Sequence, residues 1–203
     1  MKNKKAKVAV LVSGGGTNLQ ALIDAAAGGI IKSGQIALVV SNKADAYALT
    51  RAKAAKIKTA VIESDYTKMA EFEKALVCLL EENGIDLIVL AGFMLILSRD
   101  FVSRYEKRII NVHPSLIPAF CGEGFYGLRV HKAALDYGVK VTGATVHFVN
   151  EIADGGEIIM QKAVRVYEND TPERLQKRVM RQAEWKILPA AVEKVCKKIT
   201  EVE

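Results

Sequence analysis

The chain has 203 residues, 50% of them hydrophobic and 26% charged, with a formal net charge of +6. This composition is typical of a globular protein with a sizeable core, and it excludes the disordered and fibrous classes. No basic run is interleaved with aromatic residues, so the positive charge favours phosphate and carboxylate substrates over a nucleic acid.

We expect a single domain over residues 1–203, because no internal repeat or low-complexity linker divides the chain. Residues 1–7, which hold four lysines, are expected to form a disordered basic tail. The three cysteines, Cys78, Cys121 and Cys196, are too few and too far apart for a disulfide framework or a cysteine metal site. They favour a reducing compartment, and without an export or membrane segment the cytoplasm is the expected location.

The first element is predicted from the continuous apolar run Val8–Val12, which is typical of a strand buried on both faces of a parallel sheet. The loop Ser13-Gly14-Gly15-Gly16-Thr17 follows, and helical periodicity then runs from Asn18 to about Ala27. Such a loop can cradle a phosphate with backbone N–H groups, or it can simply join strand to helix. It lacks the Gly-Lys-Ser/Thr of a Walker loop, and Leu19 replaces the third glycine of a dinucleotide site, which argues against NAD.

An alternation of strands and helices continues through the middle of the chain. Strands are predicted at 36–40, 60–62 and 87–90, and helices at 47–55, 68–83 and 98–105. The segment Ala91–Leu97 leaves the fourth strand and could be plain core. With a fifth strand at 109–113, this pattern predicts an α/β fold, a doubly wound, mostly parallel sheet with helices on both faces. Ligands of such sheets bind beyond the carboxyl ends of the strands.

The fifth strand, Ile109-Ile110-Asn111-Val112-His113, stops at Pro114, which has no N–H for a sheet ladder. Asn111 and His113 are two residues apart, so their side chains point the same way. An imidazole can shuttle a proton near neutral pH, and a carboxamide can donate to an oxyanion without titrating. The same two residues could instead be structural, an asparagine in a turn and a histidine bonded to a backbone carbonyl.

The following segments predict a loop, a helix and an antiparallel addition. Ala119–Gly127 is a glycine-rich loop, either a mobile flap or a surface insertion. Leu128–Tyr137 is a helix closed by Gly138, and its His131 could equally be a surface residue or part of a site. Alternation over Val141–Val149 predicts a half-buried antiparallel strand, with His147 a residue of the strand face rather than a ligand.

The C-terminal part is predicted to hold a functional turn, a strand and a long helix. Asp154 lies in the turn Asn150–Gly156, where it could bond its own backbone or face His113. In the second case its charge would favour the imidazolium and raise the histidine pKa. A last strand is expected at 157–166, and a capped helix from 170 to about 198, possibly kinked near Pro189.

The segment Asn-Val-His-Pro-Ser-Leu-Ile-Pro at 111–118 resembles the active-site sequence of the folate-dependent formyltransferases, and the similarity runs from the glycine loop to Glu184. In that family an Asn-x-His pair and a later Asp are catalytic, which implies these roles for Asn111, His113 and Asp154. The resemblance implies transfer of a formyl group from the cosubstrate 10-formyltetrahydrofolate to the amine of glycinamide ribonucleotide in purine synthesis, with no metal. Asn111 and protonated His113 would stabilise the oxyanion, and Asp154 would keep His113 charged.

The resemblance also implies two sets of binding residues. The ribonucleotide would be bound by Gly16, Thr17, Asn18, Arg181 and Glu184. The folate would be bound by Met94, Leu95, Ile96, Leu97 and Asn111. Many members carry arginine where this chain has Leu95, and a second arginine near Met69, so contacts to the glutamate tail of the folate are not predicted here.

Two alternative functions stay open at this point. One is another formyltransferase or hydrolase with the same Asn-His-Asp set, such as the methionyl-tRNA enzyme, whose extra carboxyl-terminal domain this chain is not expected to carry. The other is a folate- or nucleotide-binding module without catalysis. The expected partners are small molecules rather than nucleic acid or a membrane, and the sequence does not decide between monomer and homodimer.

Overall fold

The computed structural model describes residues 5–64 and 67–202, and their strands form one sheet in the order β3-β2-β1-β4-β5-β6-β7. The first five strands in sequence are parallel, and β6 and β7 add to β5 in antiparallel fashion. The strands are β1 (Ala6–Val12), β2 (Gly34–Ser41), β3 (Lys58–Val61), β4 (Leu87–Leu90), β5 (Ile109–His113), β6 (Val141–Phe148) and β7 (Ile158–Arg165). The predicted doubly wound sheet with an antiparallel addition is confirmed.

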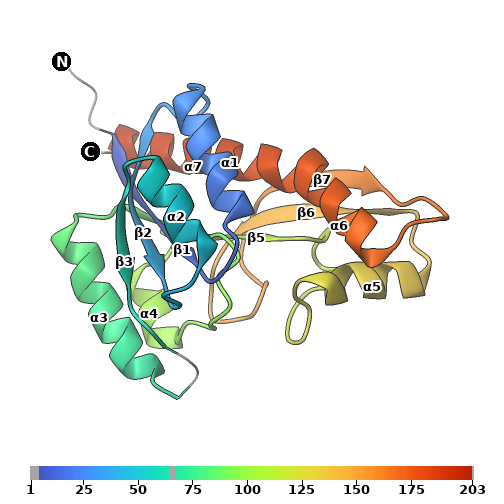
Figure 1. The fold of residues 1–203 in the computed structure, drawn as a ribbon, viewed down its shortest axis with the longest axis horizontal. Helices are drawn as coiled ribbons and strands as arrows, with labels where there is room; N and C mark the ends of the chain where they lie inside the picture. Colours follow the sequence, from blue (N-terminus) through green and yellow to red (C-terminus); the bar gives the residue numbers. More distant parts are fainter. Residues whose placement is uncertain (1–4, 65–66, 203) are drawn as a thin grey trace.

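Helices cover both faces of the sheet, as Figure 1 shows for α1 and α7 on one side and α3 and α4 on the other. The helices are α1 (Thr17–Ala27), α2 (Tyr47–Ala54), α3 (Met69–Glu82), α4 (Arg99–Arg104), α5 (Leu128–Tyr137), α6 (Pro172–Val179) and α7 (Trp185–Val202). Two hydrophobic clusters result, because alternate residues of β1 point to opposite faces. Val8 and Val10 pack with α1, α2, α6 and α7, whereas Ala9 and Leu11 pack with α3 and α4.

The N-terminal tail is shorter than predicted. Strand β1 begins at Ala6, and the backbone N–H of Lys7 donates to Asp86 Oδ2 at 2.8 Å, so residues 6 and 7 belong to the sheet. Residues 1–4 lie outside the described part of the chain.

Strand β6 is buried on both faces, which corrects the prediction of a half-buried strand. Ala144 and Val146 join the core under α6 and α7. Thr145 and His147 point to the other face and are at most 2% exposed. The alternation in the sequence therefore separates two buried environments, one apolar and one polar.

The long C-terminal helix is interrupted before Pro189 rather than at it. A π-helical turn, Met180–Glu184, joins α6 to α7, and Pro189 lies within the regular helix that follows. Single π turns of this kind are often found at functional sites, because they re-aim the side chains around them. No helix in the described ranges is long and apolar enough to cross a bilayer.

Candidate active site

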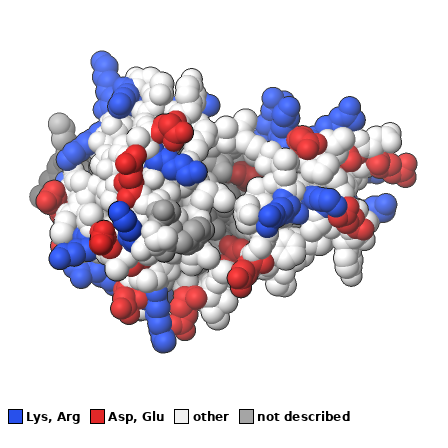
Figure 2. Space-filling model, turned by 60° about the horizontal axis from the view of Figure 1, so that its bottom comes forward, with Lys and Arg blue, Asp and Glu red and all other residues white. Residues whose placement is uncertain are grey.

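A cleft of about 880 Å³ opens where the carboxyl ends of the parallel strands meet. The segments after β1, β4 and β5 all contribute to its lining, as does the loop after β6. Figure 2 shows the molecule hollowed between the part built on β1–β4 and the part built on β5–β7. The cleft therefore gathers the segments that the sequence singled out as functional.

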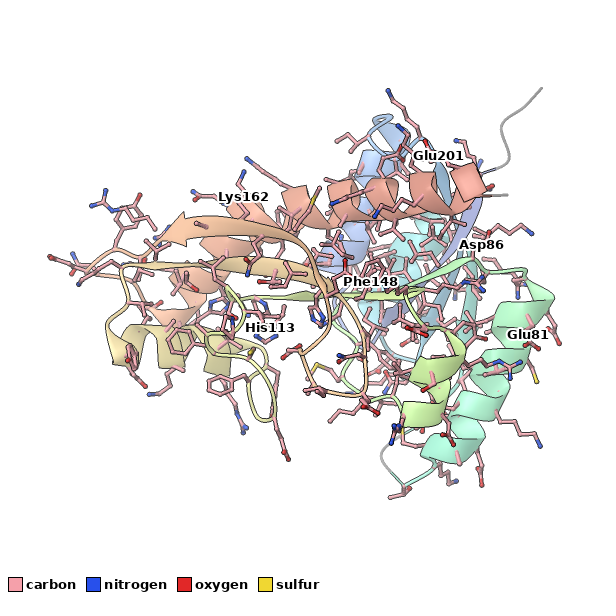
Figure 3. The ribbon with its side chains drawn as sticks, turned by 180° about the vertical axis from the view of Figure 1, so that it is seen from behind. Glu81, Asp86, His113, Phe148, Lys162 and Glu201 are labelled. Carbon is pink, nitrogen blue, oxygen red and sulfur yellow. The ribbon has the colours of Figure 1, made fainter. Side chains whose placement is uncertain are left out.

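His113, labelled in Figure 3, lies at the end of β5 and is 4% exposed. Its Nδ1 is 3.3 Å from Asp154 Oδ2, and its Nε2 is 2.9 Å from the carbonyl oxygen of Phe120. Burial lowers the pKa of the imidazole, and the Asp154 charge and the Phe120 carbonyl oppose that shift without cancelling it. Asp154 thus raises the pKa of His113 as expected, but desolvation outweighs this contact, and the net shift of the pKa is downward.

Asp154 adopts a left-handed backbone conformation with φ of 56°, which turns its side chain toward β5 and β6. Its Oδ2 accepts from the backbone N–H of Gly122 at 2.9 Å, and its Oδ1 lies 3.5 Å from His147 Nε2. Burial would raise the pKa of this carboxyl, but three contacts together lower it: a hydrogen bond from His147 when Nε2 is protonated, the Gly122 N–H and the charge of protonated His113. The carboxylate therefore faces two histidines rather than its own turn.

Asn111 and His147 stand directly opposite each other in the antiparallel pairing of β5 and β6. Asn111 Nδ2 is 3.3 Å from His147 Nε2, and His147 Nδ1 is 2.8 Å from the carbonyl oxygen of Phe148. The sequence predicts His147 to be a residue of the strand face, and the structure adds it to the site. Its position two residues beyond Thr145 on the alternating face was visible in the sequence, but the register that sets it against Asn111 was not.

The glycine loop is clamped between α1 and α2. Gly16 has φ of 70°, and a Cβ placed on it would lie 2.6 Å from the Cβ of Ala48. The N–H of Ala48 donates to the Gly14 carbonyl at 3.0 Å, and Arg51 Nε donates to the Gly15 carbonyl at 2.8 Å. Residues of α2 thus fix the position of the loop, and the loop places the N-terminus of α1 at the cleft.

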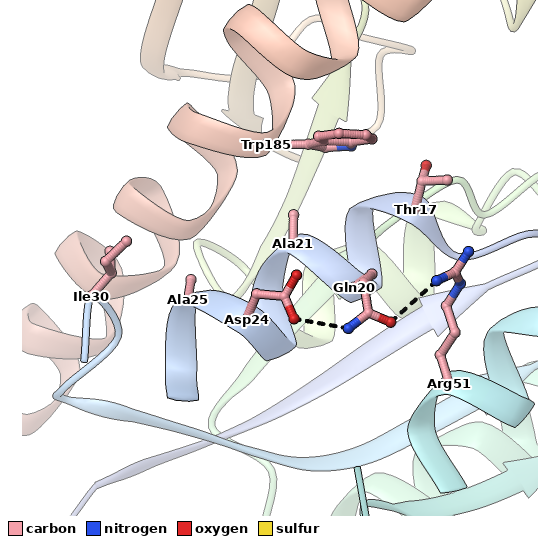
Figure 4. A pocket seen from close by; sticks show the side chains of 8 residues that line it. All are labelled: Thr17, Gln20, Ala21, Asp24, Ala25, Ile30, Arg51 and Trp185. Atoms are coloured by element: carbon pink, nitrogen blue, oxygen red, sulfur yellow. Dashed lines mark hydrogen bonds between the residues drawn. The ribbon is translucent and has the colours of Figure 1, made fainter. Parts of the chain in front are cut away.

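Thr17 and Asn18 line the main cleft, whereas Gly16 is not among its lining residues. Thr17 also borders a neighbouring hollow of about 380 Å³ between α1, α2 and the start of α7. There Arg51 donates to Gln20, whose amide donates in turn to Asp24, beneath the indole of Trp185 (Figure 4). The first turn of a helix generally presents N–H groups without intrahelical partners, and such groups can bind an anion.

The π turn holds two residues expected to bind the ribonucleotide, Arg181 and Glu184, and it turns only one of them toward the cleft. Glu184 is 6% exposed, lines the cleft and accepts from Asn18 Nδ2 at 2.7 Å. Burial raises the pKa of its carboxyl, against the effect of the Asn18 contact. Arg181 is exposed and is not among the lining residues, because the wider π turn does not keep residues three apart on one face.

The four folate candidates after β4 all line the cleft. Met94 and Ile96 are 45% and 67% exposed, whereas Leu95 is 8% exposed and packs into the core on the α3 side. The N–H of Met94 donates to Ser13 Oγ, which ties this segment to the glycine loop. The segment therefore serves both as core, through Leu95, and as the apolar wall of the cleft.

The sequence allows His131 to be either a surface residue or part of a site. The side chain is 1% exposed, so it is not a surface residue. It lines the cleft, and neither ring nitrogen has a hydrogen-bond partner among the described residues. Burial, with a smaller effect from His113, lowers its pKa to about 4. The loop 119–127 also contributes directly to the site, since Phe120 and Gly122 contact His113 and Asp154.

The described ranges hold no cluster of three His, Cys, Asp or Glu side chains that could bind a metal ion. Cys78 is exposed, Cys121 is partly buried and Cys196 is buried, and all three are free thiols. The amide of Asn111, the imidazoles of His113 and His147 and the carboxylate of Asp154 all line the cleft.

Comparison with known proteins finds a matching family model and similar proteins of known name. The sequence model of the formyl transferase family matches residues 6–192. The chain is 43% identical to the phosphoribosylglycinamide formyltransferase of Haemophilus influenzae, over 92% of this chain and 85% of that protein. A crystal structure of phosphoribosylglycinamide formyltransferase from Brucella melitensis superposes with a TM-score of 0.85 at 42% identity, covering 95% of this chain and 96% of that one.

A longer human relative, named trifunctional purine biosynthetic protein adenosine-3, is 48% identical over 96% of this chain. The match covers 19% of that protein, so the chain spans about a fifth of its length.

Proposed function

The chain belongs to the formyl transferase family, and on that premise we propose that it transfers a formyl group from 10-formyltetrahydrofolate to the amine of glycinamide ribonucleotide. The observation that carries the proposal is the meeting of Asn111, His113 and Asp154 in one cleft. The names of the relatives from Haemophilus influenzae and Brucella melitensis support this choice of acceptor.

The proposed reaction moves one formyl group and one proton. The substrate amine attacks the formyl carbon, and the carbonyl oxygen takes up negative charge. An N–H of Asn111 stabilises that oxyanion, together with the Nε2–H of protonated His113, which would exchange the Phe120 carbonyl for the substrate. As the bond to the folate nitrogen breaks, His113 supplies a proton to that nitrogen, directly or through water, and the proton lost by the amine restores the balance. Asp154 acts by holding His113 in place and favouring its charged form.

The binding part of the proposal divides the cleft between two substrates. Thr17, Asn18 and Glu184 would hold the ribonucleotide, with its phosphate on the N-terminal turn of α1. The segment from Met94 to Leu97 would hold the folate ring, largely through backbone groups and apolar contact. The proposal also includes one formyltransferase domain over residues 1–203, which acts on small molecules. Its free cysteines favour a location in the cytoplasm.

An acceptor competition tests the proposal. The purified protein is mixed with 10-formyltetrahydrofolate labelled in the formyl carbon, and the label is followed into formylglycinamide ribonucleotide, formylmethionyl-tRNA and free formate. Catalytic turnover with the ribonucleotide as the preferred acceptor is expected. Preference for charged tRNA or for water would replace the proposed acceptor, and ligand binding without any turnover would favour a non-catalytic module.

A further inference from the structure

We propose that His147 is a positioning residue for the formyl transfer: it holds the Asn111 carboxamide with its N–H₂ group ready for the oxyanion. This inference rests on the proposed function. The two residues are cross-strand partners in β5 and β6, with Nδ2 of one 3.3 Å from Nε2 of the other. His147 is 2% exposed, so its ring is held within the sheet rather than in solvent.

The hydrogen bonds of His147 define its tautomer. Its Nδ1 lies 2.8 Å from the carbonyl oxygen of Phe148, a residue labelled in Figure 3. A carbonyl oxygen can only accept, so Nδ1 carries the proton. In a neutral imidazole the other nitrogen then bears a lone pair, and Nε2 accepts from the Asn111 N–H₂ group.

This bond selects one of two amide orientations. A carboxamide rotated by 180° would present its oxygen where an N–H is needed, and that oxygen would repel the developing oxyanion. Donation to Nε2 fixes the Nδ2 end of Asn111 on the side of β6. One N–H is used for His147, and the second N–H of the same group stays available within the cleft that Asn111 lines.

The same ring also lies against the carboxylate of the site. Nε2 is 3.5 Å from Asp154 Oδ1, while the other oxygen of Asp154 faces His113. The charged or titratable groups around His147 are thus Asp154, from the loop after β6, and His113, from β5. Protonation of Nε2 would redirect it from the Asn111 amide to the carboxylate, so the neutral ring is the form that positions the amide.

A pair of variants separates this role from packing. In His147→Gln the longer side chain can place its carbonyl oxygen near the position of Nε2, where it can accept from Asn111. In His147→Asn the shorter side chain reaches only the level of Nδ1. We expect kcat of the Asn variant to fall about 10- to 100-fold, below the limit of roughly 10²–10³ for complete loss of one oxyanion donor. Both KM values should stay near those of the parent, and the Gln variant should recover most of the rate.

A double-mutant cycle tests the route of the effect. If His147 acts through Asn111, His147→Asn should have little further effect on kcat in an Asn111→Ala background. Equal loss in the Gln and Asn variants, or an undiminished loss in that background, would overturn the proposal and leave His147 as a packing residue. Thermal unfolding of each variant reports any change in stability separately.

A measurement on the unaltered protein completes the test. Long-range ¹H–¹⁵N spectra at neutral pH should show His147 protonated at Nδ1 and unprotonated at Nε2. Protonation at Nε2 instead would overturn the inference whether or not the variants fold. Formyl transfer by the parent protein is measured before any variant is compared. If the parent transfers no formyl group, the proposed function itself is contradicted.

Discussion

His113 and Asp154 come from different elements, the end of β5 and the loop after β6, yet Nδ1 and Oδ2 lie 3.3 Å apart with both side chains largely buried. Burial lowers the histidine pKa and the carboxylate partly opposes this shift. The charge of Asp154 is therefore what keeps an imidazolium accessible in a desolvated site.

Replacing that charge should move the pH dependence of the reaction. In Asp154→Asn the opposing charge is lost, so the pKa of His113 should fall further below its ordinary value. In the proposed reaction the imidazolium is the acid, so rate should be lost as pH rises through that pKa, and the alkaline limb of kcat should move to lower pH. Activity should recover in part on acidification. A limb that stays in place at full rate would leave Asp154 as a turn residue only.

Gly16 should tolerate no side chain, while Gly14 should tolerate one. The Cβ of an alanine at position 16 would lie 2.6 Å from the Cβ of Ala48. The left-handed backbone at this position would also cost a residue other than glycine roughly 1–2 kcal/mol. We expect Gly16→Ala to lower stability and to raise KM for the ribonucleotide more than KM for the folate. Gly14→Ala is the matched control, since its Cβ would meet no atom within 4 Å. Equal effects on both KM values would place the phosphate elsewhere.

Glu184 should matter for binding more than for folding. Burial raises the pKa of the Glu184 carboxyl in the folded protein, so the carboxyl ionises at lower pH in the unfolded chain. The carboxyl therefore destabilises the fold as the pH rises above the ordinary pKa of glutamate. Glu184→Gln removes this penalty and keeps an acceptor for Asn18, so stability at pH 7 should not fall. KM for the ribonucleotide should rise about tenfold or more if a charged hydrogen bond is lost. Chemical unfolding at pH 7 with steady-state kinetics checks both parts, and an unchanged KM would remove Glu184 from the ribonucleotide site.

His131 should make the protein sensitive to acid. Its pKa of about 4 lies below the unfolded value near 6.5, so between these values only the unfolded chain binds the proton and acid favours unfolding. From pH 6.5 to pH 5 this costs roughly 2 kcal/mol of unfolding free energy. His131→Phe should flatten that dependence. Urea unfolding at the two pH values measures it, and equal slopes for parent and variant would contradict the assignment.

The sheet could be predicted from the sequence because its signals are local. Continuous apolar runs such as Leu87–Leu90 indicate strands buried on both faces, and the helix Leu128–Tyr137 closes at Gly138 as expected. The candidate residues Asn111 and His113 could be found from their spacing and from the Pro114 that stops the strand. Their meeting with Asp154 was only one of two alternatives for that residue.

What the sequence did not yield depends on register and on desolvation. Alternation fixes the face of His147 but not the partner opposite it, because the pairing of β5 with β6 depends on the geometry of the long connection between them. The π turn before α7 changes which residue of the helix faces the cleft, and this selects Glu184 over Arg181. The net pKa direction of His113 required its burial, which no pattern of neighbours in the sequence reports.

The most direct test of the account compares the parent with His113→Ala, using formyl-labelled 10-formyltetrahydrofolate and glycinamide ribonucleotide. The parent should transfer the label to the amine of the ribonucleotide. The variant should bind both substrates but turn over about 10²–10⁴-fold more slowly, the usual contribution of a positioned proton donor. Transfer at a rate close to that of the parent would contradict the assignment of His113, and label appearing only in formate would contradict the proposed transfer itself.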